Sequence, residues 1–140
     1  MANHTKRIER RRADNAERRQ SKFDAHHRWA RMAASKVKLV ADQVRGLPIN
    51  QALEQLQFST KRAARMIGKV VRSALANAEY QISERKLDLD VDKLFVSEVR
   101  VGVAPSMKRY MTRSRGMAYQ ILKHSCHIGV TLAPGAEARA

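Results

Sequence analysis

Three potential metal ligands lie close together near the C-terminal end of the chain, namely His124, Cys126 and His127. Histidine and cysteine at close spacing could hold zinc, which prefers four nitrogen or sulfur ligands in a tetrahedron. The surrounding residues alternate as in a strand, however, and neighbouring side chains of a strand point to opposite faces. The three side chains therefore cannot converge on one ion, and no CxxC pair completes a site. We expect no metal here.

Residues for other catalytic chemistry do not form recognisable groups either. No pair of carboxylates lies in an apolar setting, and no nucleophile has a plausible base and orienting partner. No glycine-rich loop matches a nucleotide-binding fingerprint. These patterns predict a protein that is not an enzyme and that needs no cofactor. The single cysteine, Cys126, allows no internal disulfide, which suits a reducing compartment.

Positive charge is the strongest chemical signal in the sequence. The 140 residues include 28 Lys and Arg against 13 Asp and Glu, a formal net charge of +15. Such an excess predicts an anionic partner, and nucleic acid is the usual one, because Lys and Arg displace counterions from its phosphates. A membrane surface is the competing anion, but we find no apolar run of spanning length and no signal peptide.

Part of this charge falls on a predicted helix that begins near Ser59 or Thr60 and ends near Tyr80. Apolar residues at helical spacing, from Ala63 through Ile67 to Ala78, mark its buried side. On another side, cations recur every three or four residues: Lys61, Arg65, Lys69 and Arg72. This row is either a phosphate-binding ridge or an ordinary solvated face.

Two shorter helices precede this one. The first is predicted to start at Ser35 as N-cap and to stop before Gly46 and Pro48. Its apolar stripe is Val37, Val40, Ala41 and Val44, with Lys36, Lys38 and Arg45 off the stripe. The second helix is predicted from about Asn50 to Phe58.

Near the C-terminal end, two stretches alternate with period two and predict a β-hairpin over about residues 93–132. Its arms are residues 93–103 and 117–132, and residues 104–116 form a tip that carries four cations and no acid. At the base, Cys126, Ile128, Val130 and Leu132 share one face, which indicates a strand half-buried on a core. The tip has no apolar set of its own, so a bound polyanion would have to hold it. The alternative is a shorter hairpin with a mobile basic loop.

The remaining segments flank this domain. Residues 1–22 form a basic extension that either orders on RNA or stays solvated. Residues 23–32 predict an edge strand, in which Trp29 is interpreted as a core anchor rather than a platform for a base. The organisation is therefore an extension (1–22), a globular domain with its hairpin (23–133) and a C-terminal tail (134–140).

Four short motifs resemble a known family in their order and separation. They run from Lys36 to Gly46, from Ser73 to Glu79, from Pro105 to Arg109, and over His127 and Ile128. Together they resemble the large ribosomal subunit protein twenty-two family, bacterial type, over about residues 29–132. Departures lie at Ala104, Thr112 and Lys123–Cys126, and the first 22 residues match nothing in the family pattern.

The resemblance implies an α+β fold in which three helices pack on a small three-stranded antiparallel sheet, with a long protruding β-hairpin. It implies a cytoplasmic structural constituent of the large ribosomal subunit that binds large-subunit (23S) rRNA and supports early subunit assembly. The hairpin tip would line the nascent-peptide exit tunnel, beside neighbouring ribosomal proteins and the nascent polypeptide. A membrane or a second copy is not an expected partner.

Carried over by position, the tunnel-lining residues would be Met107, Lys108, Arg109, Tyr110, Met111, Arg113 and Arg115. The residues expected to contact rRNA are Arg18, Arg19, Arg28, Arg31, Lys36, Lys38, Arg45, Lys61, Arg65, Lys69, Arg72, Arg100, Lys123, His124 and His127. Phosphates and RNA shape, rather than a base code, would set the position of the protein. The rival interpretations are a free nucleic-acid-binding regulator, which would need a compact reading surface and often a dimer, and an enzyme acting on RNA.

Overall fold

The computed structural model describes residues 23–87 and 89–135, so the basic extension with Arg18 and Arg19, and most of the C-terminal tail, lie outside it. The elements are β1 Phe23–Ala30, α2 Ala34–Val44, α3 Ile49–Phe58, α4 Arg62–Arg85, β2 Leu94–Thr112 and β3 Ala118–Pro134, with short 3-10 helices at Val91–Lys93 and Ser114–Gly116. The strands form one antiparallel sheet in the order β1-β3-β2. This confirms the α+β class and places β1 at an edge, as predicted.

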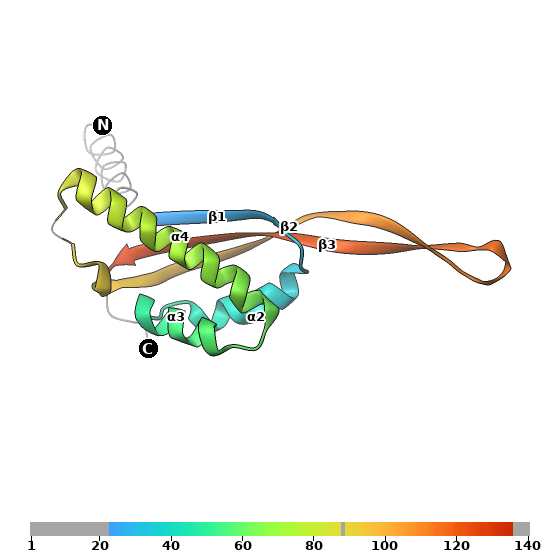
Figure 1. Ribbon diagram of the computed structural model, residues 1–140, viewed down its shortest axis with the longest axis horizontal. Coiled ribbons are helices and arrows are strands. Elements are labelled where there is room, and N and C mark those ends of the chain that lie inside the picture. The colour runs from blue at the N-terminus through green and yellow to red at the C-terminus, as the bar shows by residue number, and fades with distance from the viewer. Residues whose placement is uncertain (1–22, 88, 136–140) are drawn as a thin grey trace, which may run out of the picture.

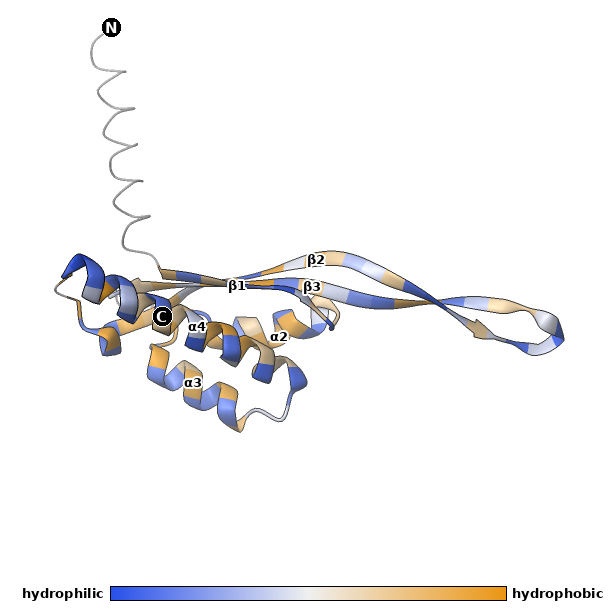
Figure 2. Cartoon of the chain, turned by 45° about the horizontal axis from the view of Figure 1, so that its top comes forward, coloured by the Kyte–Doolittle hydropathy of each residue, from blue (hydrophilic) through white to orange (hydrophobic). Residues whose placement is uncertain are grey.

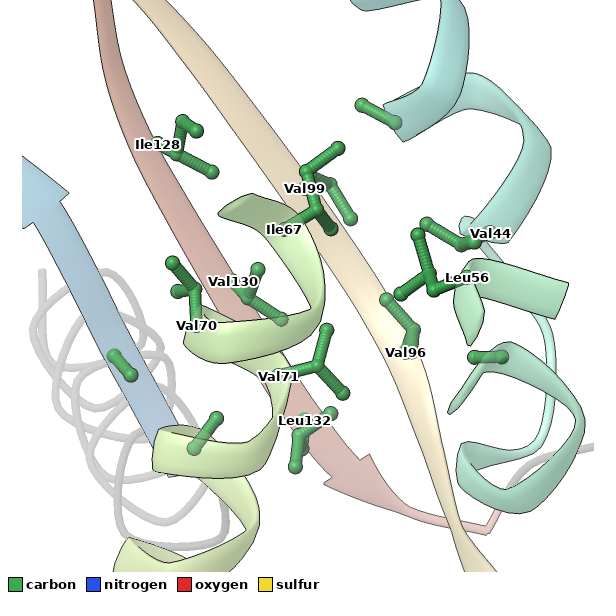
Figure 3. Packing of buried hydrophobic residues seen from close by; sticks show 14 of the residues in the cluster. Val44, Leu56, Ile67, Val70, Val71, Val96, Val99, Ile128, Val130 and Leu132 are labelled. Carbon is green, nitrogen blue, oxygen red and sulfur yellow. The ribbon is translucent and has the colours of Figure 1, made fainter. Parts of the chain in front are cut away.

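The helices pack on one face of the sheet and leave the other face open (Figure 1). The strand face predicted to be inward, from Cys126 to Leu132, is fully buried. Ile67, Val70 and Val71 of α4 lie over Val130 and Leu132 of β3, while Val44 of α2 and Leu56 of α3 lie near β2 (Figure 3). Burial of these side chains supplies the main stabilisation of the domain, because removing each apolar side chain from water contributes roughly 1.5–3 kcal/mol of free energy.

The helix boundaries differ from the sequence prediction in two places. Ser35 is not an N-cap, because α2 begins at Ala34. The N-cap residue is Ala33, whose side chain has no oxygen that could accept a hydrogen bond from the first backbone N–H groups of the helix. The predicted stop is confirmed: Gly46 has φ +84°, a conformation that favours glycine. Helix α4 extends to Arg85 rather than Tyr80, because the partly buried Ile82 continues its packing against the core.

The exposed edge of β2 is covered at its base by the turn between α2 and α3. The backbone N–H of Gly46 donates to the carbonyl of Val96, and the N–H of Val96 donates to the carbonyl of Leu47, at 2.8 and 2.9 Å. These bonds satisfy groups that an open sheet edge would expose to other chains.

Strand β2 continues much further than its apolar pattern predicted, whereas β3 begins close to its predicted start. Strand β1 ends opposite Cys126, and beyond that point β2 and β3 pair alone out to Thr112 and Ala118 (Figure 1). Only residues 113–117 form the turn, so the interpretation as a short hairpin with a long basic loop is wrong. The ladder shifts register between Ala104 and Met107, where Pro105 has no N–H to offer, and then resumes.

We call residues 105–124 of this projection the distal hairpin. None of its residues is buried, and hydrophilic and hydrophobic residues are mixed along it (Figure 2). It therefore contributes nothing to the core of the domain.

Within the described residues, no helix is both long and apolar enough to cross a membrane.

Candidate nucleic-acid interface

A groove opens where the distal hairpin leaves the globular body, and we call it the neck groove. Three parts of the chain line it: the start of α2 with the residues before it, the start of α4, and the near end of the distal hairpin. Its volume is about 870 Å³. Its lining includes six cations and no acid; the cations are Arg31, Lys36, Lys61, Arg62, Arg109 and Lys123. Phosphates are the natural counterpart of such a lining.

The helix starts at this groove strengthen its positive potential. Neither α2 nor α4 has an acidic residue in its first turn or a side-chain cap, and Lys36, Lys61 and Arg62 stand there instead. The N-terminus of a helix already carries partial positive charge, so cations at this position are unfavourable in the free protein. An anion bound between the two helix starts would relieve this cost.

The far end of the hairpin carries a second group of cations. Lys108, Arg113 and Arg115 are exposed, and Arg113 lies over the ring of Tyr119, with 5.7 Å from its guanidinium carbon to the ring centroid. No acid occurs between Val99 and Gly135. The charge of the distal hairpin is therefore open to an external anion.

The α4 ridge, defined as Lys61, Arg65, Lys69 and Arg72, is exposed along its whole length. In the part of the chain that the structure describes, none of the four forms an ion pair with an acid. The ridge begins at the neck groove, because Lys61 belongs to both surfaces. The two cationic surfaces therefore meet at Lys61.

A comparison of the sequence with models of protein families gives a match for this chain. Residues 25–133 match the family model described as ribosomal protein L22p/L17e, which covers most of the chain. The chain belongs to the L22p/L17e family. It is therefore a structural constituent of the large ribosomal subunit in the cytoplasm, where it binds large-subunit rRNA and neighbouring ribosomal proteins. Members of the L22p/L17e family are structural proteins rather than enzymes.

Two of the arginines expected to contact rRNA in this L22p/L17e chain already form ion pairs within the chain. Arg45 pairs with Asp42 at 3.0 Å and donates to the carbonyl of Val99 at 3.3 Å. Arg100 donates two bonds of 2.7 Å to the carboxylate of Glu98, and this contact raises the pKa of Arg100. Their charge is partly neutralised within the chain, unlike that of the neck groove.

The expectation that Trp29 anchors the core is wrong. Its side chain is 57 % exposed on the helix-free face of the sheet, and its backbone has φ +62°. The β1–β3 register shifts between His27 and Ala30, so that Ala30 takes the inward position and Trp29 is turned outward. The backbone N–H of Trp29 donates to Nδ1 of His127 at 3.2 Å, and the two rings meet edge-on with centroids 5.0 Å apart.

Of the three potential metal ligands, the neighbours Cys126 and His127 point to opposite faces of the sheet, as strand alternation predicted. Cys126 points into the core, His127 lies with Trp29 on the helix-free face, and His124 contacts Oγ of Ser106 at 3.0 Å beside the neck groove. In the described ranges, no three His, Cys, Asp or Glu side chains gather as a metal site would require.

Apart from Lys38, the remaining expected contact residues lie on three separate surfaces of the L22p/L17e fold. Met107, Arg109, Lys123 and His124 line the neck groove with Arg31, Lys36 and Lys61; Tyr110, Met111, Lys108, Arg113 and Arg115 lie further out; Arg28 and Arg100 lie on the helix-free face, and Lys38 is exposed on α2 outside the groove. The sequence interpretation missed Arg62, although its place beside Lys61 at a helix start was a usable signal. It also missed Leu39 and Leu122, since exposed leucines leave no periodic signal.

Proposed function

We propose that the neck groove, the α4 ridge and the distal hairpin hold rRNA phosphates, and that the hairpin tip lines the nascent-peptide exit tunnel. The observation that carries this proposal is the distal hairpin, a slender cationic ribbon without acids and without a buried residue. A two-stranded ribbon alone is marginally stable in water. Surrounding phosphates would stabilise it, and its narrow end could reach a passage that a globular domain could not enter.

At the tip, the side chains offered to a passing chain would be Tyr110, Met111, Arg113 and Arg115. Tyr110 is 73 % exposed and Met111 is 44 % exposed, so both are free to contact a nascent polypeptide. Residues nearer the body, Met107 and Arg109, line the neck groove and are better placed for rRNA.

A protein with this shape would also support subunit assembly. The neck groove lies where the distal hairpin leaves the body and the turn lies at its far end, so the two would contact different rRNA segments. Binding both segments would lower the entropic cost of bringing them together. Cells carrying only a hairpin-shortened protein should then accumulate immature large-subunit particles on sucrose gradients.

The tunnel position is tested by photo-crosslinking. A photoreactive amino acid replaces Tyr110 in ribosomes that carry a stalled, labelled nascent chain, and we expect a crosslink to that chain. The control places the same amino acid at Tyr80, which is 65 % exposed on α4 of the globular body and should not crosslink. A tip that crosslinks only to rRNA, in ribosomes that have incorporated the protein, would contradict the tunnel position.

The phosphate contacts of the α4 ridge are tested by neutralisation. Replacing Lys61, Arg65 and Lys69 by Gln should weaken binding to a large-subunit rRNA transcript and reduce the slope of log affinity against log salt by about two. Adding three acids to the exposed side of α3, by Gln51→Glu, Gln55→Glu and Gln57→Glu, changes the net charge equally and should leave the slope unchanged. Equal slopes in the two variants would show that the ridge is merely solvated.

A further inference from the structure

The neck groove is not only cationic, because apolar side chains stand among its cations. Leu39 of α2 is 62 % exposed, Leu122 of β3 is 48 % exposed, and Met107 of β2 is 38 % exposed. Leu39 lies off the buried stripe of its helix, and Leu122 and Met107 belong to the distal hairpin, which has no core. A surface that bound phosphates alone would gain nothing from apolar side chains left in water.

We propose that the neck groove holds an unpaired RNA segment. Its phosphates would lie on a rim formed by the six cations of the groove, and one unstacked base would lie against an apolar floor formed by Leu39, Met107 and Leu122. The proposal rests on the phosphate contacts proposed above for the same groove. It adds the kind of RNA that the groove accepts, a bulge, loop or single-stranded junction rather than a continuous duplex.

The chemistry of the groove favours this occupant. In a duplex the base faces are stacked and the deep groove is closed to side chains, so an apolar floor could contact a base only in unpaired RNA. A volume of about 870 Å³ lies within the range of roughly 300–1,000 Å³ of sites that enclose small molecules. Cations surround the floor from three segments of the chain, so phosphates on either side of the inserted base would find partners.

Polar groups at the rim could orient such a base. His124 lines the groove, and its Nδ1 contacts Oγ of Ser106 at 3.0 Å. The Ser106 hydroxyl can both donate and accept, so the pair offers hydrogen bonds to a base edge beside the apolar floor. An acidic peptide is the other polyanion that could enter the groove. Its acidic side chains have no planar apolar group, so they would leave Leu39, Met107 and Leu122 without a partner.

The experiment compares two probes with the purified full-length protein by fluorescence anisotropy. One is an oligouridylate of ten nucleotides, and the other is its abasic counterpart with the same ribose-phosphate backbone. We expect the protein to bind the base-bearing probe about five- to tenfold more tightly, since one base covers apolar surface. The combination of Leu39→Ala and Leu122→Ala should reduce this preference to less than twofold.

Two control variants separate the base contact from the phosphate contacts. Phe58→Ala removes an apolar side chain that is 84 % exposed on α3, outside the groove, and should keep the full preference for bases. Lys36→Glu should weaken both probes by the same factor, because it acts on phosphates. If Lys36→Glu changed neither probe, the phosphate contacts of the groove would fail, and the base proposal with them.

Three results would overturn the base contact alone. The first is equal affinity of the unaltered protein for the two probes, which would leave a groove for phosphates only. The second is an undiminished preference in the Leu39→Ala, Leu122→Ala variant, which would place the base elsewhere. The third is displacement of the RNA by polyglutamate of equal charge as readily as by oligouridylate, which would indicate an acidic peptide.

Discussion

Cys126 is fully buried on the inner face of β3, and this burial raises the pKa of its thiol. A raised pKa means that the folded protein keeps the proton at a pH where the unfolded chain has lost it. The free energy of unfolding should therefore fall as the pH rises above about 8.5, the ordinary pKa of cysteine.

The measurement is urea unfolding between pH 7 and pH 10, with Cys126→Ala as the control that lacks the titrating group. The unaltered protein should lose more stability across this range than the variant. The thiol should also react slowly with a water-soluble disulfide reagent until urea unfolds the protein. Parallel stability curves for the two proteins would show that the thiol titrates normally.

Gly68 is buried inside α4, yet a larger residue would fit there. A Cβ added at this position would come no closer than 3.9 Å to a neighbouring atom, the Cβ of Leu56, which is ordinary contact. Because glycine is unfavourable in a helix interior, Gly68→Ala should raise the free energy of unfolding by about 0.5–1 kcal/mol.

Gly129 offers the contrasting case for this prediction. A Cβ there would lie 2.8 Å from Nδ1 of His26 on the helix-free face, so the imidazole would have to move. Thermal unfolding measures both variants, and Gly129→Ala should not stabilise the protein. A loss of stability in Gly68→Ala would mean that α4 and α3 pack more tightly than the structure indicates.

At the scale of elements, α2 begins without a cap at a point where it lines the neck groove. Ala33 occupies the N-cap position with extended backbone, φ −67° and ψ 136°, which Asp or Ser can adopt. Ala33→Asp should stabilise the free protein by about 0.5–1.5 kcal/mol, through a cap bond and through its charge at the positive end of the helix. The same carboxylate should weaken RNA binding several-fold, because it lies among the cations of the groove.

Thermal unfolding and binding to a large-subunit rRNA transcript measure the two effects separately. Ala33→Ser is the matched control, since it supplies a cap without a charge and should stabilise the protein while leaving RNA binding nearly unchanged. Tighter RNA binding by Ala33→Asp would rule out a phosphate at this helix start.

At the scale of the whole molecule, the structure separates into a body that carries the core and a hairpin that carries charge. Replacing residues 105–124 with Asn-Gly would join Ala104 to Ser125, two paired residues that are both buried. Asn-Gly is the preferred two-residue turn of a hairpin. Because no core residue is removed, unfolding should remain cooperative with a melting temperature changed by only a few degrees.

The same shortened protein should bind the rRNA transcript more weakly, since it lacks five cations: Lys108, Arg113 and Arg115 of the outer hairpin, and Arg109 and Lys123 of the neck groove. Trp29 fluorescence follows unfolding, and a filter-binding titration follows RNA affinity. Loss of cooperative unfolding would show that the distal hairpin stabilises the body, against the separation described here.

Local patterns in the sequence determined most of the secondary structure of this protein. The stripe from Val37 to Val44 fixed α2, and the alternation from Cys126 to Leu132 fixed the inner face of β3, because the side-chain period reports burial directly. The absence of acids between Glu98 and Glu137 likewise indicated an anionic partner for the hairpin. These features depend on neighbours in sequence and need no knowledge of the fold.

Tertiary structure decided where distant side chains meet. The neck groove joins residues from Arg31 to His124, so no window of sequence contains it. The register shift after His27 turned Trp29 outward, and cross-strand pairing carried β2 to Thr112 although its apolar pattern ends earlier. Backbone hydrogen bonds to another strand are independent of side-chain type. Periodicity therefore predicted the core of this protein and the span of its hairpin, but not how far β2 pairs before the turn or which residues line the groove.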